Sequence, residues 1–147
     1  SRSAYERDEA NINVLIKEKK INQFGIVLAD INWLKECNDS KGHDSGDKLI
    51  IEVANTLKRI FVTDKLYRIG GDEFVIILDS NECNKSNNLM NEVKNDLKNR
   101  TDGVSYSCGL SLYNKEKDKS LNDVFIRADI AMYDRKKIMK RQSDKIK

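Results

Sequence analysis

Two apolar runs on either side of a Gly-Gly pair, in the stretch LYRIGGDEFVIIL (residues 66–78), constrain the fold of this chain more than any other feature. Leu66–Ile69 and Phe74–Leu78 have the length and the composition of strands. Paired glycines between two such runs are typical of a β-hairpin turn. Asp72 and Glu73 follow the glycines directly, so the stretch predicts a hairpin with two adjacent carboxylates at the mouth of its second strand.

The other apolar patterns predict two further strands and four helices. Phe24–Ile31 (FGIVLADI) is a short, nearly continuous apolar run, typical of a strand that is covered on both faces. Residues 104–112 alternate between apolar and small or polar side chains, as in a half-buried strand. Helical spacing of apolar residues predicts helices around residues 3–20, 49–61, 89–97 and 121–132, and the polar segments 38–47 and 79–88 are predicted to be loops.

The predicted order of elements is helix, then β-α-β-β-α-β, then helix. This is the order of a ferredoxin-like α+β core, palm-like, with additional helices and a mainly antiparallel sheet. A chain of 147 residues suits one such domain. We see no internal repeat and no linker, so we expect a single domain over residues 1–147, with a strongly basic tail at 141–147 that frays.

Composition and charge exclude several classes of function. The net charge of +3 gives no reason to expect nucleic-acid binding or direct membrane contact, and no apolar stretch approaches the length of a membrane span. A single histidine, His43, excludes a site that needs two imidazoles. Cys37, Cys83 and Cys108 are widely spaced, so we expect reduced thiols and a cytoplasmic protein, or the cytoplasmic part of a larger, membrane-anchored one.

Three carboxylates are candidates for a metal site. Asp30 ends the first predicted strand, which in a β-α-β-β core lies beside the hairpin that carries Asp72 and Glu73. Acids at buried strand ends need solvent or a cation, and Mg²⁺ commonly combines one or two carboxylates with substrate phosphates. From spacing alone, solvated turn residues explain Asp72 and Glu73 equally well, and Asp30 alone is more typical of a strand-terminating surface residue.

Four sequence blocks resemble one family, the GGDEF domains or diguanylate cyclases. RIGGDEF (Arg68–Phe74) is similar to its signature, and DINWLKECNDSKGHDSGDKLI (Asp30–Ile50) resembles its block Asp-x-x-x-(Phe/Leu)-Lys-x-x-Asn-Asp…Gly-His-x-x-Gly-Asp. SCGLS (Ser107–Ser111) resembles its fourth strand, and RADIAMYDRKK (Arg127–Lys137) resembles its block Ala-Asp-x-Ala-Leu-Tyr-x-Ala-Lys. The blocks stand in the family's order and cover nearly the whole chain.

This resemblance implies a metal site and a catalytic set. Asp30 and Asp72 would be the metal-binding carboxylates, joined by the backbone carbonyl of Ile31. Glu73 would contact the second metal ion or act as the general base, and the resemblance does not separate these roles. The implied catalytic residues are therefore Asp30, Asp72 and Glu73, with two Mg²⁺ or Mn²⁺ ions in each active site.

The resemblance also implies how guanine is recognised. Asn38 and Asp47 occupy the positions that bind the base. The chemistry fits, because a carboxylate can accept hydrogen bonds from the guanine N1–H and amino group, and an amide can pair with another part of the base edge. Considered without the resemblance, Asn38 is more typical of a residue that stabilises a turn. Asp47 is then more typical of a carboxylate whose charge is favourable near a helix N-terminus.

The triphosphate contacts follow from the same resemblance. Lys35, Lys136 and Lys140 would neutralise the phosphates as point charges. Gly70 and Gly71 would let the hairpin backbone approach them. Each feature has a plain structural alternative, because lysines are common on solvated helix ends and any hairpin can use paired glycines.

The activity that the resemblance implies is condensation of two GTP molecules into cyclic di-GMP, with release of two pyrophosphates. Two copies of the domain would face each other as a homodimer, each holding one GTP, and a sensory domain would precede them in the full-length protein. The alternative is a catalytically silent GGDEF domain that binds GTP as a regulatory module. A polymerase-like palm that acts on nucleic acid is disfavoured by the mild charge and the few aromatic residues.

The chain departs from the family pattern at four places. Asn32 stands where the family often has a second aspartate, and Met139-Lys140 stand in place of a closing Gly-Arg. The family's first block is absent, so we expect the chain to begin just inside the usual start of the domain. Lys140 and the missing first block leave the silent alternative open. Phe61 replaces the arginine of an inhibitory Arg-x-x-Asp product site at residues 61–64, which predicts no product inhibition through that site.

Overall fold

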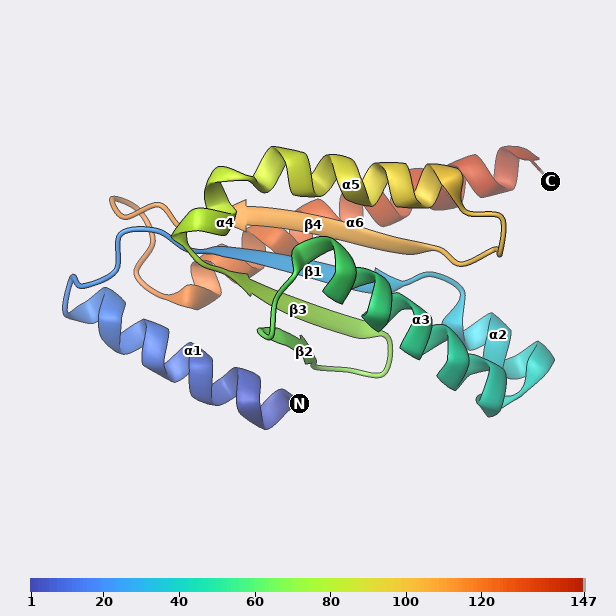
Figure 1. Ribbon diagram of the computed structural model, residues 1–147, viewed down its shortest axis with the longest axis horizontal. Coiled ribbons are helices and arrows are strands. Elements are labelled where there is room, and N and C mark those ends of the chain that lie inside the picture. The colour runs from blue at the N-terminus through green and yellow to red at the C-terminus, as the bar shows by residue number, and fades with distance from the viewer. Residues whose placement is uncertain (147) are drawn as a thin grey trace.

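A four-stranded antiparallel sheet forms the centre of the protein, in a computed structural model that describes residues 1–146 (Figure 1). The strands are β1 (Gly25–Ile31), β2 (Leu66–Arg68), β3 (Glu73–Leu78) and β4 (Tyr106–Leu112), and their order across the sheet is β2-β3-β1-β4. Because β1 pairs with both β3 and β4, its apolar run is central and is buried on both faces, as the sequence predicts.

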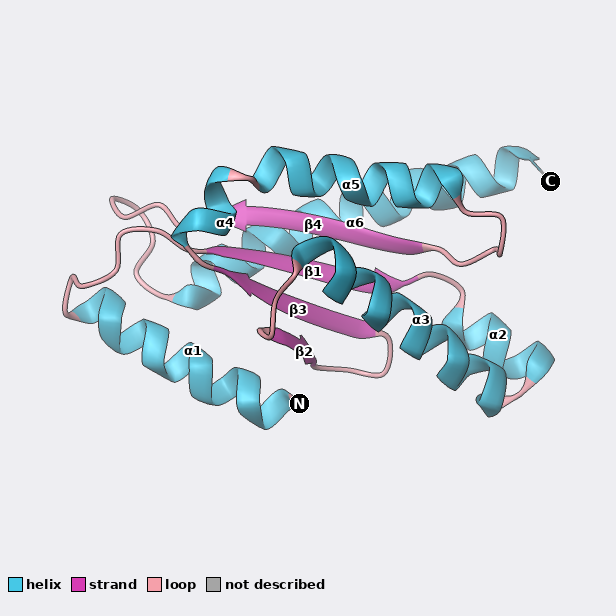
Figure 2. Ribbon diagram, viewed as in Figure 1, coloured by secondary structure: helices cyan, strands magenta, loops and turns pink. Residues whose placement is uncertain are grey.

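Helices cover both faces of this sheet (Figure 2). α3 and α5 pack on the face that includes Val27 and Ala29, whereas α1 and α6 pack on the face that includes Ile26 and Leu28. Alternate residues of β1 therefore enter two separate hydrophobic cores. The architecture is the predicted ferredoxin-like, palm-like core with additional helices. The helices are α1 (Arg2–Lys17), α2 (Leu34–Lys41), α3 (His43–Phe61), α4 (Ser80–Asn84), α5 (Ser86–Asn99) and α6 (Leu121–Ile146).

Two segments predicted to be loops are largely helical. Residues 38–47 lie mostly in α2 and in the first turns of α3, which meet at Gly42, a residue with a φ of +89°. No residue of α2 is buried, so the helix has no apolar stripe by which sequence periodicity could reveal it. Within residues 79–88, α4 begins with a capping box in which Asp79 and Glu82 each accept a hydrogen bond from the other's backbone N–H.

α6 is longer than the sequence predicts, because it continues to Ile146 although its apolar stripe ends at Met132. None of the residues from Tyr133 to Asp144 is buried, so periodicity gives no sign of this second half. The fraying expected for residues 141–147 stays a prediction, and Lys147 lies outside the described residues. No helix within residues 1–146 combines the length and the apolar character needed to span a membrane.

Gly109 determines how closely α6 approaches β4. A Cβ atom at this position would lie 2.2 Å from the backbone nitrogen of Met132 and 2.3 Å from the carbonyl oxygen of Ala128. Both atoms belong to the helix backbone, so a larger residue would have to push α6 away from the sheet. The close approach matters for the site, because α6 carries Lys136 and Lys140.

A buried ionic network joins α3, α5 and β4. The Arg100 guanidinium, with a side chain only 10% exposed, donates from Nε to Asp96 Oδ2 at 2.8 Å. The same carboxylate oxygen accepts a hydrogen bond from the hydroxyl of Tyr106 at 2.7 Å. The guanidinium also donates to Glu52 at 3.1 Å and to Asp102 at 2.8 Å. Arg100 thus holds together three elements of the core opposite α6.

Candidate active site

The end of β1 and the start of β3 bring the three predicted carboxylate residues together. Asp30 is the register partner of Glu73 in the antiparallel ladder between these strands. One residue further on, the backbone N–H of Ile31 donates to the carbonyl oxygen of Asp72 at 2.8 Å. The convergence predicted from a β-α-β-β core is therefore present at the level of the backbone.

Asp30 lies in a partly buried ion pair with α6. Its Oδ2 atom is 2.6 Å from the ammonium nitrogen of Lys136, and the two side chains are 16% and 17% exposed. Its other oxygen, Oδ1, is buried and accepts no hydrogen bond from a donor among the described residues. Burial raises the pKa of Asp30, and Asp72 adds to the rise, while Lys136 acts against it. A buried carboxylate oxygen without a donor is costly, and a cation would satisfy it.

Glu73 lies in a strongly acidic environment. Burial raises the pKa of this carboxyl, and the charges of Asp30, Asp129 and Asp72 raise it further, while Arg2 lowers it. Sequence reasoning did not select Asp129 as a site residue. Its spacing in the chain was a usable signal, because it precedes Lys136 by seven residues, or about two helical turns, on α6.

The chemistry of these donors fits a hard divalent cation with few protein ligands. Among residues 1–146, no three carboxylate, imidazole or thiol side chains are grouped closely enough to hold a metal ion by themselves. The carboxylates of Asp30, Asp72 and Glu73 are nevertheless close enough for their charges to interact: Asp72 raises the pKa of Asp30, and both raise that of Glu73. Mg²⁺ commonly takes only one or two carboxylates and completes its octahedron with phosphates and water. The unpartnered oxygen of Asp30 is a donor of this kind.

Two of the three predicted phosphate-binding lysines reach the end of β1 or the segment that follows it. Lys136 contacts Asp30, and the ammonium of Lys140 lies 5.6 Å from the centroid of the Trp33 ring, a cation–π contact. Trp33 has a left-handed backbone with a φ of 68° and precedes α2, which no side chain caps. Lys35 is exposed in the first turn of α2. An uncapped helix N-terminus beside lysines attracts anions.

Asn38 and Asp47, the residues predicted to bind guanine, come from α2 and α3. A Cβ atom on Gly46 would lie 1.7 Å from Asn38 Oδ1, so the absence of a side chain there admits Asn38 against the backbone next to Asp47. Among the described residues, neither side chain hydrogen-bonds to the turn between the helices. Asp47 is the fifth residue of α3 rather than part of its first turn, which weakens the helix-dipole alternative.

The Gly70-Gly71 turn is a four-residue connection between β2 and β3, in which Ile69 N–H donates to the carbonyl of Glu73 at 3.0 Å. Arg68 folds back and donates to the carbonyl oxygens of Gly70 and Gly71 at 2.8–3.2 Å. Neither glycine has a positive φ, so the backbone conformation does not require them. A Cβ on Gly71 would meet nothing within 4 Å, which leaves this backbone open to a ligand.

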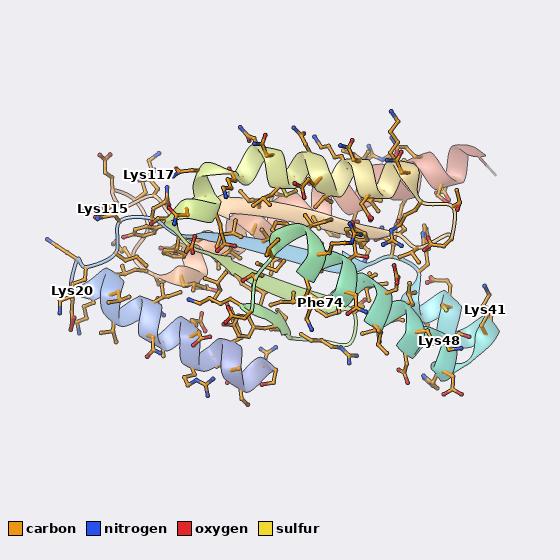
Figure 3. All side chains as sticks on the ribbon, viewed as in Figure 1. Lys20, Lys41, Lys48, Phe74, Lys115 and Lys117 are labelled. Atoms are coloured by element: carbon orange, nitrogen blue, oxygen red, sulfur yellow. The ribbon has the colours of Figure 1, made fainter. Side chains whose placement is uncertain are left out.

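Exposed lysines lie at both ends of the molecule. Figure 3 shows Lys41 and Lys48 at the end where α2 and α3 meet, and Lys20, Lys115 and Lys117 at the opposite end. They do not form one continuous basic face in this view.

The chain resembles proteins of one family in sequence. The model of the family described as "Diguanylate cyclase, GGDEF domain" matches residues 6–142. The uncharacterised protein YtrP of Bacillus subtilis is 35% identical over 121 residues, which cover 80% of this chain and 21% of that protein. Diguanylate cyclase A of Treponema denticola is 31% identical over 127 residues, which cover 81% of this chain and 34% of that protein. The chain thus spans about a fifth to a third of the length of these relatives.

Solved structures agree in fold. The active GGEEF domain of a diguanylate cyclase from Vibrio cholerae superimposes with a TM-score of 0.75 at 21% identity, covering 92% of this chain and 89% of that one. The GGDEF domain of DgcB from Caulobacter crescentus, in complex with c-di-GMP, gives a TM-score of 0.74 at 23% identity, covering 92% and 84%. With the family match over residues 6–142, these findings show that the chain belongs to the GGDEF domain family of the diguanylate cyclases, which are nucleotidyltransferases.

Proposed function

We propose that this domain condenses two GTP molecules into cyclic di-GMP and two pyrophosphates, at an interface between two copies of the chain. One observation carries the proposal: Asp30 and Asp72 lie together at the same end of the sheet, beside Lys136. Asp30 there has one buried oxygen without a partner among the described residues. A cation-binding edge next to a phosphate-binding lysine suits a nucleoside triphosphate.

Two divalent ions, Mg²⁺ or Mn²⁺, would be held by Asp30, Asp72, Glu73 and the carbonyl oxygen of Ile31. Bound there, they would lower the pKa of the attacking hydroxyl and stabilise negative charge on the leaving pyrophosphate. The protein's own residues do the positioning. Lys35, Lys136 and Lys140 neutralise the triphosphate, and the turn at Gly70 and Gly71, whose backbone is open at Gly71, lets the hairpin lie against it.

The reaction needs two copies because each chain carries one such site. The 3′-hydroxyl of one GTP attacks the α-phosphate of the GTP held by the facing copy. A bond forms between the 3′-oxygen and the α-phosphorus, the bond to the bridging oxygen of pyrophosphate breaks, and the hydroxyl proton leaves. Glu73 has one of two roles in this step: it contacts the second metal ion, or it accepts that proton, and the second role suits a carboxyl whose pKa burial and neighbouring carboxylates raise.

The direct test incubates the protein at high concentration with GTP and Mg²⁺ and identifies the products by mass. Cyclic di-GMP and pyrophosphate are expected, with a rate that rises more steeply than the protein concentration because two copies must meet. Binding of GTP without any product, even when two domains are joined by a fused dimerising helix, would favour the silent regulatory module instead.

Asp47→Ala is expected to weaken discrimination between GTP and ATP by about tenfold to a hundredfold, the value of one hydrogen-bonded charge. The reacting groups are untouched, so kcat with saturating GTP should stay near that of the wild type. The ratio of kcat/KM values for the two nucleotides measures the effect. Asp39→Ala removes a neighbouring exposed carboxylate of α2 and serves as control. An unchanged ratio in Asp47→Ala would exclude this residue from base recognition.

Added cyclic di-GMP is expected to leave the initial rate at saturating GTP unchanged. Phe61, at the position of the family's inhibitory arginine, is only 2% exposed and packs in the core, so it offers the product no cation. Initial rates with and without added product, at saturating GTP, test this. Inhibition that GTP cannot overcome would reveal a product site elsewhere on the domain.

We further propose that the domain works in the cytoplasm under the control of a sensory domain of the same protein. The relatives support this proposal through their length, since the matched segment is 21% of one and 34% of another. A sensory domain would act by bringing two copies together, because the proposed reaction depends on their encounter.

A further inference from the structure

A small buried polar cluster lies directly behind the proposed metal site. Asn32, only 2% exposed, follows Asp30 and Ile31 in the chain. Its amide nitrogen Nδ2 donates to Ser105 Oγ at 2.9 Å, and its Oδ1 accepts from Ser107 Oγ at 3.0 Å. Ser107 is fully buried and is the register partner of Asp30 on β4. The carboxamide therefore joins the end of β1 to β4.

The cluster also reaches α6. Asn32 Nδ2 lies 3.7 Å from the sulfur of Met139, and Ser107 Oγ lies 3.5 Å from the same atom. Met139 comes three residues after Lys136, about one turn along the helix. The segment 30–32 thus contacts this part of α6 twice, through the ion pair of Asp30 with Lys136 and through the contact of Asn32 with Met139.

The neutral amide of Asn32 suits its buried position between β1, β4 and α6. Asn32 can donate to Ser105 and accept from Ser107 at the same time, so its buried polar groups are satisfied. A carboxylate at residue 32 would place a second buried negative charge two residues from Asp30, against a thioether that cannot neutralise it. With Asn32, the Lys136 ammonium has Asp30 as its carboxylate partner.

We propose that Asn32 is a positioning residue that acts through Met139 to hold Lys136 beside Asp30. Its importance for catalysis rests on the proposed function, in which Lys136 neutralises the triphosphate. Lys136 lies at the end of a flexible side chain, on a part of α6 where no residue from Tyr133 to Asp144 is buried. Contacts with the sheet must therefore fix this part of the helix, and the Asn32–Met139 contact is one of them.

The test removes the contact from either side. Asn32→Ala and Met139→Ala are each expected to raise the labelling of Lys136 by an amine-reactive reagent several-fold, measured by mass spectrometry relative to the neighbouring Lys137. Both should raise KM for GTP about tenfold, with a smaller change in kcat, because the lysine that binds phosphate is displaced. If both variants act through one contact, the double variant should show less than the sum of the two effects.

Asn13→Ala is the matched control. Asn13 Oδ1 accepts from the backbone N–H of Leu121, so this variant loosens the opposite end of α6. It should lower the melting temperature without changing Lys136 labelling or KM. Equal labelling of Lys136 in all variants and wild type would overturn the inference, as would fully additive effects in the double variant. If Asn32→Ala fails to fold, Met139→Ala, whose residue is only partly buried, decides the question alone.

The labelling measurement separates this inference from the proposed function, because it needs no turnover. If the wild-type protein makes no cyclic dinucleotide but Asn32→Ala raises the labelling of Lys136, the proposed activity is refuted and the positioning role is retained. If the protein converts GTP to product but Lys136 is labelled equally in every variant, the positioning role is refuted and the activity is retained.

Discussion

Asp72→Asn is expected to lower the rate of cyclic dinucleotide formation by about a thousandfold, since it removes a charge that the proposed reaction needs in its transition state. The substitution keeps the shape of the side chain. The backbone carbonyl of Asp72 accepts from Ile31 N–H at 2.8 Å, and this hydrogen bond to β1 is unaffected. The melting temperature should therefore change little, and the loss should be confined to catalysis.

Initial rates by product mass and melting curves by calorimetry measure the two effects together. Asp134→Asn is the control, because it removes an aspartate of α6 that is 61% exposed and that pairs with Lys137 at the surface. Its rate should equal that of the wild type. Wild-type turnover in Asp72→Asn would show that the metal site has been assigned to the wrong residues.

Arg100→Met is expected to lower the free energy of unfolding by about 3–5 kcal/mol, the cost of removing one partner of a buried ion pair. Methionine retains much of the apolar stem of arginine but none of its donors. Asp96, with a side chain 12% exposed, would keep the hydroxyl of Tyr106 but lose its nearest cation. Urea unfolding curves at neutral pH measure the difference, and two variants with equal denaturant slopes can be compared directly.

Arg59→Met gives a matched control, because Arg59 contacts the same carboxylate at 3.2 Å but is 64% exposed. Exposed ion pairs contribute at most about 1 kcal/mol, so this variant should remain close to the wild type. A loss below about 1 kcal/mol in Arg100→Met as well would mean that the network contributes no more than surface pairs do.

The effect of Arg100→Met should also depend on pH. Burial alone would raise the pKa of Asp96, but hydrogen bonds from Arg100, Tyr106 and Arg59 outweigh it and hold the pKa below its ordinary value of 3.8. A lowered pKa in the folded state means that the network's contribution is complete above the ordinary pKa and disappears as the pH falls through the lower, folded one. The difference between variant and wild type should therefore narrow in acid.

The sequence predicts the sheet well because its signals are local. The apolar run of β1 and the two runs around the glycines have the length of strands. Their order predicts that the two runs around the glycines pair as a hairpin and that β1 lies beside it. Sequence periodicity does not predict α2, because none of its residues is buried. It does not predict the second half of α6 for the same reason, since no residue from Tyr133 to Asp144 is buried. α4 is different, since the spacing of Asp79 and Glu82 is a capping-box pattern that could have indicated a helix start.

The site is predictable only in part. Strand order predicts that Asp30, Asp72 and Glu73 lie together, because adjacent strand ends must meet, whereas their metal-binding roles follow from the family resemblance. Asn38 and Asp47 follow only from the family resemblance, since their spacing alone favours turn and dipole roles. The contacts of Lys136 with Asp30 and of Asn32 with Met139 join residues 106 and 107 positions apart, so no local pattern indicates them. They depend on how closely α6 packs at Gly109.

The ion pair between Lys136 and Asp30 has a thermodynamic consequence. The ion pair, 2.6 Å long, leaves both partners able to bind further: the Lys136 ammonium has N–H donors left for a phosphate, and Asp30 Oδ1 faces no donor among the described residues and can take a cation. One contact therefore places a cation and a phosphate next to each other. Because their charges are opposite, each should raise the affinity of the other by the same factor, in either order of addition.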